Sequence, residues 1–363
     1  MKRESLTSED WVWTVDRLGG EQRITSLALH CGAFKRAREI GSAIDLLRIT
    51  LAYCLGHMGL RTTAAWAEAV GLASLSNVAL LRRLRKTSEW LSCLIGQLLR
   101  ASCPKAAKGR VIRILDGTSV AQAGPGSRRD NRLWRIHASF ELPSERFDFL
   151  ELTDDRGGER LDRVPVMRGE IRIGDAAYMQ VDQIGEVMTQ GADVLVRANW
   201  RNARWFDQQA RPLDLLALLG SAMDSGSVDQ LVLIGSSKKG KAPLPMRLIA
   251  LRKPEAARAE ARRKARRNAQ REGRNASEEM LFACEWVILV TSLSQEDFAM
   301  DDILKLYRMR WRIELAFKRL KSLAGLRSPP AKDPRLAKPW ILSHLLMILL
   351  VEPLTDEFGV SLS

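Results

Sequence analysis

At residue 111 the apolar pattern of the chain changes from a helical spacing to the short, continuous runs that are typical of β-strands. Five runs have this character: 111–115, 136–142, 147–152, 171–175 and 193–197. The first three follow one another, whereas a helical stretch at 179–190 separates the last two. Consecutive strands followed by a helix–strand alternation predict a mixed sheet with helices on its faces, which is an α/β fold.

Residues 1–105 are predicted to form a helical domain, because their apolar residues recur at helical spacing. Within this domain a short helix at 62–71 is followed by Ser76, which can cap a second helix. The second helix ends in a basic run that includes Arg82 and Arg83. The pattern resembles a helix-turn-helix, which would bring these arginines to DNA. Packing within a helical bundle explains the pattern equally well.

The segment 201–283 interrupts the alternation of strands and helices. Two strands are predicted within it, at 231–234 and 246–251, around a turn at 238–241. The strand pattern then returns at 285–291, and a helix is predicted from about residue 301. We therefore expect an inserted, β-rich segment between two parts of one sheet domain.

The inserted segment ends in a strongly basic helix at 253–274. Its arginines form two i,i+4 rows, one of Arg258, Arg262 and Arg266 and the other of Arg263, Arg267 and Arg271. Like charges at this spacing repel each other. A solvated helix or a disordered linker would explain the composition, but a phosphate backbone would neutralise it. The net charge of +14 over the whole chain also favours nucleic acid as the partner.

The cysteines and the apolar segments place the protein in a reducing cytoplasm without a membrane anchor. Five cysteines are odd in number and show no CxxC pairing, so neither a zinc site nor a disulfide framework is predicted. The most apolar stretch, 340–354, is interrupted by His344, Glu352 and Pro353. It is too short and too broken to span a bilayer, and a buried C-terminal helix is expected.

Two isolated aspartates, Asp116 and Asp175, each follow an apolar strand-like run and each have a glycine neighbour. A carboxylate is out of place there unless the edge of the sheet exposes it to a ligand, and glycine permits a close approach. Carboxylates are natural ligands for Mg²⁺. Phosphodiester transfer needs two divalent ions about 4 Å apart. Each aspartate taken alone is also compatible with an ordinary turn.

The predicted helix from residue 301 carries a charged row. Tyr307, Glu314 and Lys321 are seven residues apart, and Arg310 falls on the same face of a continuous helix. The glutamate can complete a metal site with the two aspartates, and the cations can hold phosphates beside it. Together these residues predict an enzyme that cuts and joins DNA.

The chain resembles the DDE transposases of bacterial insertion sequences, in the insertion-sequence-four group. That group carries a Tyr-(2)-Arg-(3)-Glu-(6)-Lys signature, which is complete here as Tyr307, Arg310, Glu314 and Lys321. The second aspartate of the family lies in an Asp-x-Gly/Ala-Tyr/Phe box, which residues 175–178 match. Many members have arginine after that aspartate, where this chain has Ala176. The resemblance covers about residues 60–330.

The resemblance implies an RNase H-like mixed sheet with flanking helices, an inserted β-rich domain before the last catalytic helix, and an N-terminal helical domain. The implied parts are a DNA-end-binding domain at 1–105, catalytic segments at 106–200 and 284–335, an inserted domain with the basic helix at 201–283, and a helical tail at 336–363. Asp116, Asp175 and Glu314 would be the catalytic residues and the ligands of Mg²⁺, for which Mn²⁺ can substitute.

The resemblance also implies DNA contacts. Arg310 and Lys321 would bind phosphates of the transposon end, and Tyr307 would contact the backbone near the cut. Some members pass through a DNA hairpin in which a tryptophan stacks on a flipped base. Trp286 and Trp311 are the candidates, because stacking on a splayed base suits either ring. A place in the core is the alternative for both.

We therefore predict a bacterial, cytoplasmic and nucleoid-associated DNA transposase. It would act on the inverted-repeat ends of its element and on target DNA, as a homodimer in the synaptic complex. The N-terminal helices would recognise the ends, with Arg82 and Arg83 in contact with DNA, and Arg263 and Arg267 would bind its backbone. Two alternatives remain open, an RNase H-like nuclease without strand transfer and an inactive DNA-binding derivative.

Overall fold

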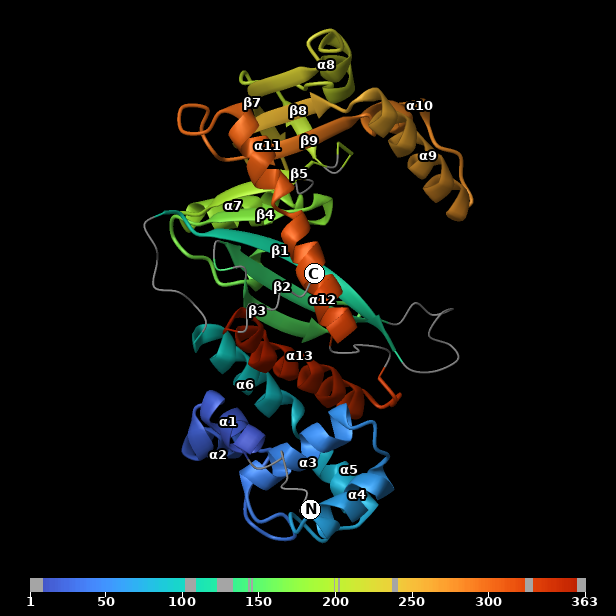
Figure 1. Ribbon diagram of the computed structural model, residues 1–363. Coiled ribbons are helices and arrows are strands. Elements are labelled where there is room, and N and C mark those ends of the chain that lie inside the picture. Colours follow the sequence, from blue (N-terminus) through green and yellow to red (C-terminus); the bar gives the residue numbers. More distant parts are fainter. Residues whose placement is uncertain are drawn as a thin grey trace.

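The computed structural model describes residues 9–101, 109–122, 133–142, 144, 146–198, 200–201, 203–236, 241–323 and 329–357 (Figure 1). Parts of the predicted end domains, including residues 1–8 and 358–363, and most of the predicted turn at 238–241 lie outside these ranges.

One nine-stranded sheet forms the centre of the described structure, in the order β3-β2-β1-β4-β5-β9-β8-β7-β6. The strands are β1 (Ile112–Ala121), β2 (Leu133–Leu142), β3 (Arg146–Thr153), β4 (Ile171–Gly174), β5 (Asp193–Arg197), β6 (Arg204–Phe206), β7 (Ser227–Gly235), β8 (Leu244–Arg252) and β9 (Trp286–Thr291). β4 pairs in parallel with β1 and β5, and the remaining pairs are antiparallel. This large mixed sheet makes the fold α/β and is compatible with the RNase H-like expectation.

The helices lie on both faces of the sheet and at its two ends (Figure 1). They are α1 (Glu9–Arg17), α2 (Gly20–His30), α3 (Ala43–Leu55), α4 (Leu60–Ala69), α5 (Asn77–Leu84), α6 (Ser88–Ala101), α7 (Val181–Thr189), α8 (Leu215–Ser221), α9 (Glu255–Arg271), α10 (Glu278–Ala283), α11 (Met300–Arg308), α12 (Trp311–Leu323) and α13 (Pro334–Glu357). Two short 3-10 helices, η1 (Leu161–Arg163) and η2 (Ala176–Tyr178), lie beside β4 in the sequence.

The period-2 alternation of strand side chains divides the interior into two cores. Along β1, Ile114 belongs to the core beneath α12 and α13, whereas Leu115 belongs to the core beneath α7. The first core continues without interruption into the N-terminal helices. Both faces of the central strands are therefore buried, as expected for a sheet covered by helices on both sides.

The predicted inserted segment does not form a sheet of its own. Its strands extend outward from β9 in the order β8, β7 and β6, and β9 pairs with β5 on its other side. An unpaired β9 edge would expose a row of backbone N–H and C=O groups, and β8 satisfies them. The basic helix is confirmed as α9, which projects from the sheet together with α10 (Figure 1).

The predicted C-terminal helix is confirmed as α13, which packs against α6 and α3 of the N-terminal domain (Figure 1). Among the described residues, α13 alone is long and apolar enough to cross a membrane, over Pro334–Val351, so the prediction that this stretch is too short to span a bilayer is wrong. Two thirds of that window (67%) is buried inside the molecule, as in the core helix of a folded domain. α13 thus joins the sheet to the N-terminal helices.

The prediction for the helix that begins near residue 301 is also wrong. The continuous helix expected from residue 301 is two helices, because α11 ends at Arg308 and α12 begins at Trp311. The backbone turns between them, where the N–H of Arg310 donates to the carbonyl of Tyr307 at 3.1 Å. Tyr307 and Glu314 therefore belong to different helices and do not share one helical face.

Candidate active site

The two predicted aspartates lie side by side, Asp116 within β1 and Asp175 directly after the parallel strand β4. The β1–β4 register pairs Ile112 with Ile171 and Ile114 with Ile173, and the next step in that register matches Asp116 with Asp175. Because strand side chains alternate, both carboxylates follow Ile114 and Ile173 onto the same face of the sheet. Sequence analysis placed Asp116 at the end of a strand, whereas β1 continues past it to Ala121.

Asp175 leaves β4 at the start of η2, where its carboxylate accepts a hydrogen bond from the N–H of Ala177 at 2.8 Å. The preceding glycine has a steric reason. A Cβ atom at Gly174 would lie 2.8 Å from the Cβ atom of Tyr178, whose ring is buried beneath this turn. The Asp175-to-Tyr178 box is thus a tight turn that fixes the aspartate at the sheet edge.

Glu314 lies on α12, and Arg310 links it to Asp116 by forming an ion pair with each carboxylate. The Arg310 guanidinium lies 3.7 Å from Oδ2 of Asp116 and also pairs with Glu314. Asp116 and Glu314 both line a cavity of about 560 Å³, together with Gly117, Thr118, Phe317, Lys318 and Lys321. Lys318, one helical turn after Glu314, was not predicted, although its i,i+4 spacing is visible in the sequence.

Burial raises the pKa of the Asp116 carboxyl to about 6. The Gly117 N–H, which donates to it at 2.8 Å, and the Arg310 guanidinium oppose this shift, whereas the carboxylates of Asp175 and Glu159 add to it. Burial also raises the pKa of the Tyr307 phenol, against the effect of the Arg310 guanidinium. Negative charge is therefore concentrated at this edge, with Arg310 as its neighbouring cation.

Glu159 is a fourth carboxylate at this edge, and sequence analysis did not identify it. A Cβ atom at Gly117 would lie 2.9 Å from Oε1 of Glu159, so glycine at 117 is what lets the carboxylate approach. Burial raises the pKa of Glu159, and the Asp175 carboxylate raises it further. Glu159 lies in an irregular segment between β3 and η1. It therefore belongs to no strand or helix whose residue pattern could have marked it in the sequence.

Three side chains hold the backbone around Glu159. The Gly158 carbonyl accepts from Arg163 Nε at 2.8 Å, and the Glu159 carbonyl accepts from Gln180 Nε2 at 2.9 Å. Gln183 accepts from the Leu161 N–H at 2.9 Å. The Glu159 carboxylate itself makes no hydrogen bond or ion pair within the described part of the chain. Its position beside the aspartates is therefore set by its backbone.

The structure separates the two candidate tryptophans. Trp286 is 1% exposed in β9 and packs in the core beneath α7, which supports the alternative of a place in the core. Trp311 is 52% exposed at the start of α12, with the Arg312 guanidinium 6.0 Å from its ring centre. An inward-facing strand position explains the burial of Trp286.

Of the predicted DNA-binding cations, Lys321 lines this cavity, whereas Arg82, Arg83, Arg263 and Arg267 lie outside it. α4, a turn at Gly71 with φ 74°, and α5 with its Ser76 cap form the expected pair of helices. Arg82 is exposed at the end of α5, and the neighbouring Arg83 lies 3.9 Å from Glu39. Arg263 and Arg267 are exposed on α9.

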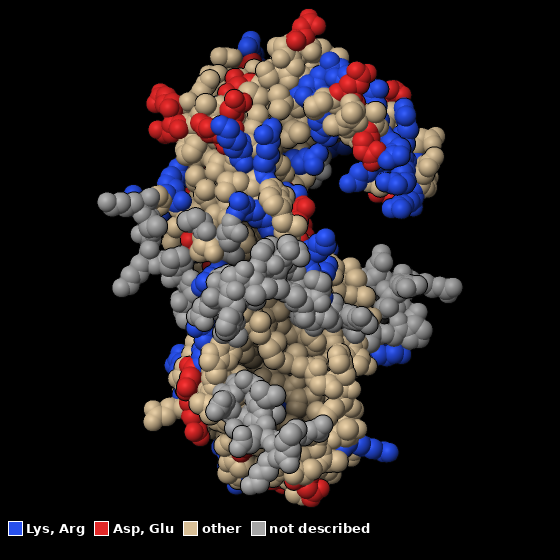
Figure 2. Space-filling view, in the orientation of Figure 1, with Lys and Arg blue, Asp and Glu red and all other residues tan. Residues whose placement is uncertain are grey.

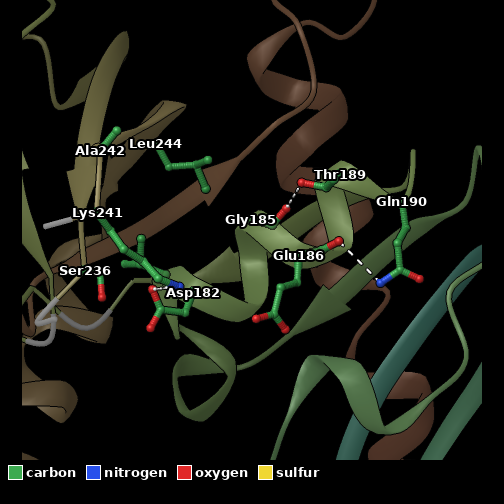
Figure 3. Close-up of a pocket in the computed structure, with 10 residues that line it drawn as sticks. Asp182, Gly185, Glu186, Thr189, Gln190, Ser236, Lys241, Ala242 and Leu244 are labelled. Atoms are coloured by element: carbon green, nitrogen blue, oxygen red, sulfur yellow. Dashed lines mark hydrogen bonds and ion pairs between the residues drawn. The ribbon is translucent and has the colours of Figure 1, made fainter.

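A second cavity, of about 570 Å³, lies between α7 and the start of β8 (Figure 3). Its polar wall includes Asp182 and Lys241, which form an ion pair at 3.0 Å. None of the predicted site residues lines it. Among the described residues, no three His, Cys, Asp or Glu side chains lie close enough to share a metal ion. The carboxylate edge instead carries the Arg310 guanidinium between Asp116 and Glu314.

Comparisons with known proteins identify the family of this chain. Residues 151–350 match the family model described as the transposase DDE domain, a segment that includes Asp175 and Glu314 and begins after Asp116. The chain is 37% identical over 353 residues to InsL, the protein assigned as the transposase of insertion sequence element IS186A in Escherichia coli strain K12. It is 37% identical over 354 residues to the transposase of insertion sequence element IS421 of Escherichia coli. Each alignment covers 96% of this chain and 94% of the relative.

Proposed function

Since this chain belongs to the DDE transposase family, whose members act on DNA and whose domain implies a divalent metal, we propose that it cuts the ends of an insertion sequence and joins them to target DNA. We assign it to the insertion-sequence-four group on the Tyr-Arg-Glu-Lys signature. The observation that carries the proposal is the β1–β4 register, which aligns Asp116 with Asp175, together with the cavity that Asp116 and Glu314 both line.

The proposed metal ligands are Asp116, Asp175 and Glu314, with Mg²⁺ as the ion and Mn²⁺ as its substitute. The position of Arg310 supports a cation there, because its guanidinium already contacts two of the three carboxylates. When bound, a pair of divalent ions would activate the attacking oxygen and stabilise the leaving oxygen of a phosphodiester. Glu159 would add negative charge behind Asp175 and so favour cation binding.

The cations around the carboxylates would hold the DNA backbone. Lys318 and Lys321 line the cavity with Glu314 and are exposed, so phosphates can reach them. Arg310 can exchange its carboxylate partners for a phosphate when metal ions take its place. Trp311 has the exposed ring that stacking on an unpaired base requires. Tyr307, half-buried at the end of α11, would contact the backbone near the cut.

Recognition of the ends would fall to the N-terminal helices, where α5 presents Arg82. The full reaction would take place in the bacterial cytoplasm within a synaptic complex of two copies. The relatives are proteins of bacterial insertion sequences, which supports these expectations.

The test is an assay of the purified protein with Mg²⁺, DNA that carries the inverted repeats bracketing its gene, and a supercoiled target. We expect nicks at the repeat ends and repeat DNA covalently joined to the target. Glu314→Gln should abolish both products while leaving binding to the repeat DNA within a few-fold of wild type. Cleaved ends that never join the target would indicate the nuclease alternative, and no cleavage under any divalent metal would refute the proposal.

A further inference from the structure

Helix α9 carries a concentration of positive charge that the catalytic site does not use. Seven of its 17 residues are arginine or lysine and two are glutamate. Together with α10 it forms an arm that projects from the sheet (Figure 1). Figure 2 shows lysine and arginine gathered on this arm, including the side that faces the hollow between the arm and the body.

The base of the arm is held by one buried carboxylate. Glu285, 1% exposed just before β9, pairs with Arg252 at 3.3 Å, with Arg258 at 3.8 Å and with Arg262. Two of these arginines belong to the first i,i+4 row of α9. Ala269, 1% exposed, lies on the same face of the helix and closes the packing. This row therefore fixes the orientation of the helix.

The second arginine row points away from that anchor. At 100° per residue, Arg263, Lys264, Arg267 and Arg271 fall on the face opposite Arg258 and Ala269. All four side chains are exposed. Arg263 pairs with Glu260 at 2.5 Å on the same face, whereas Lys264, Arg267 and Arg271 form no ion pair within the described part of the chain. Among the described residues, the repulsion between Lys264, Arg267 and Arg271 therefore has no compensating carboxylate.

We propose that α9 is an arm that binds the phosphate backbone of duplex DNA without reading its sequence, through Arg263, Lys264, Arg267 and Arg271, while Glu285 holds the arm in place. The proposal rests on the proposed function and extends it to the DNA that has no fixed sequence, either flanking or target DNA. Arginines at i,i+4 rise roughly 6 Å apart along the helix axis, and the row spans roughly 12 Å, enough to follow several phosphates of one strand.

The composition of the arm favours duplex DNA over other polyanions. α9 contains no aromatic side chain, so it offers nothing on which unpaired bases could stack. It also contains no large apolar side chain, which an amphipathic helix needs to bind an anionic membrane surface. The phosphates of duplex DNA are therefore the partner that best neutralises this row of cations.

The test compares the double variant R267Q/R271Q with R168Q/R211Q, which removes two exposed arginines outside the arm. Binding is measured in EDTA, to a random-sequence duplex, to the repeat-end duplex and to random single-stranded DNA, over a range of salt concentrations. For R267Q/R271Q we expect weaker binding to both duplexes by a similar factor. We also expect the slope of log K against log salt to fall by about 2, one per lost phosphate contact. The control should change neither quantity.

Equal effects of the two double variants would overturn the proposal, as would a loss confined to the repeat-end duplex or to single-stranded DNA. Tight binding to anionic vesicles that is lost in R267Q/R271Q, with no loss on duplex DNA, would also overturn it. Because EDTA removes catalysis from the assay, a failure of the cleavage proposal leaves this result unaffected.

A second variant tests the anchor. Glu285→Gln removes the charge that Arg252, Arg258 and Arg262 share, so the arm should lose its fixed orientation. We expect faster hydrogen exchange confined to residues 255–271, together with weaker binding to the random duplex. Unchanged exchange in the arm would contradict the anchoring role.

Discussion

At the scale of single residues, Asp116 is held in surroundings that oppose its charge. It lies inside β1 with its side chain 15% exposed, and the carboxylates of Asp175 and Glu159 are close enough to raise its pKa. Such an arrangement costs stability and is typical of sites that await a cation. Removing the charge of Asp116 should therefore stabilise the fold.

Asp116→Asn should stabilise the metal-free protein at neutral pH. The pKa of about 6 in the folded state lies above the ordinary value of 3.8. Between these values the folded protein holds a proton that the unfolded chain has released, so the free energy of unfolding falls as pH rises through this window. Asparagine does not titrate, so the free energy of unfolding of the variant does not fall in this window for that reason. At pH 7.5 in EDTA the variant should be more stable by up to about 3 kcal/mol, and by much less at pH 4.

Urea denaturation of both proteins at the two pH values checks this. A variant that is no more stable than wild type at pH 7.5 would show that the Asp116 carboxyl is not under strain.

Gly117→Ala should impair function while sparing the fold. Its added methyl group would meet Glu159 Oε1 at 2.9 Å, and the carboxylate is the flexible end of that side chain, so it can move away. We expect a change of less than about 1 kcal/mol in the free energy of unfolding. Cleavage should nevertheless drop roughly 10-fold or more, because the displaced carboxylate no longer supports the metal ligands. Thermal denaturation and the cleavage assay measure the two effects.

Gly158→Ala is the matched control, because a Cβ atom at Gly158 meets nothing within 4 Å. Equal activity of the two alanine variants would argue against a role for Glu159.

Sequence reasoning identified Asp116, Asp175 and Glu314 because each breaks a local pattern or belongs to a spaced motif. Glu159 breaks no pattern, since an acidic residue in a polar loop is unremarkable, and only the tertiary approach to Gly117 gives it meaning. The burial of Trp286 could not be predicted from the sequence either, for a different reason. A tryptophan in a short strand does not reveal which side faces solvent, and here both faces of the sheet are covered.

At the scale of elements, the turn between α11 and α12 decides how the signature residues meet. Neither Met309 nor Arg310 is a glycine or a proline, so no helix-breaking residue marks the interruption in the sequence. The heptad spacing of Tyr307, Glu314 and Lys321 therefore rested on a helix that does not exist as one piece. The turn places Arg310 between Asp116 and Glu314.

Strands β1, β3 and β4 are joined beneath the site by a buried ionic network. Glu170, with its side chain fully buried, accepts from Arg113 at 2.7 Å and from Arg172 at 2.6 Å. Arg113 also pairs with Asp148 of β3. The strands were predicted from their apolar residues. The ion pairs between their charged residues could be assigned only once the order of the strands was known.

Glu170→Ala should therefore destabilise the protein by about 3–5 kcal/mol, because it leaves the buried Arg172 without its carboxylate and leaves Arg113 with Asp148 alone. Glu278→Gln, an exposed change in α10, should stay within about 0.5 kcal/mol of wild type. Chemical denaturation of the three proteins measures the difference. A cost for Glu170→Ala as small as that of the surface variant would mean that the network does not stabilise the sheet.

At the scale of the whole molecule, the sheet is assembled from segments far apart in the chain. β5 pairs with β9, so the inserted residues between them had to leave the sheet and return, and they extend it by three strands. The α/β class and most elements were predictable, since they depend on local periodicity. The continuation of one sheet through the insertion, and the docking of α13 on α6 and α3, depend on long-range pairing that local patterns do not encode.

The same long-range assembly brings together the elements that bear Asp116, Asp175 and Glu314. The central proposal is that these three residues bind divalent metal ions together. Electron paramagnetic resonance of Mn²⁺ bound to the protein on repeat-end DNA tests it most directly. Asp116→Asn, Asp175→Asn and Glu314→Gln should each weaken Mn²⁺ binding by at least roughly 10-fold, whereas Glu278→Gln should bind like wild type. Wild-type Mn²⁺ affinity in all three carboxylate variants would contradict the account.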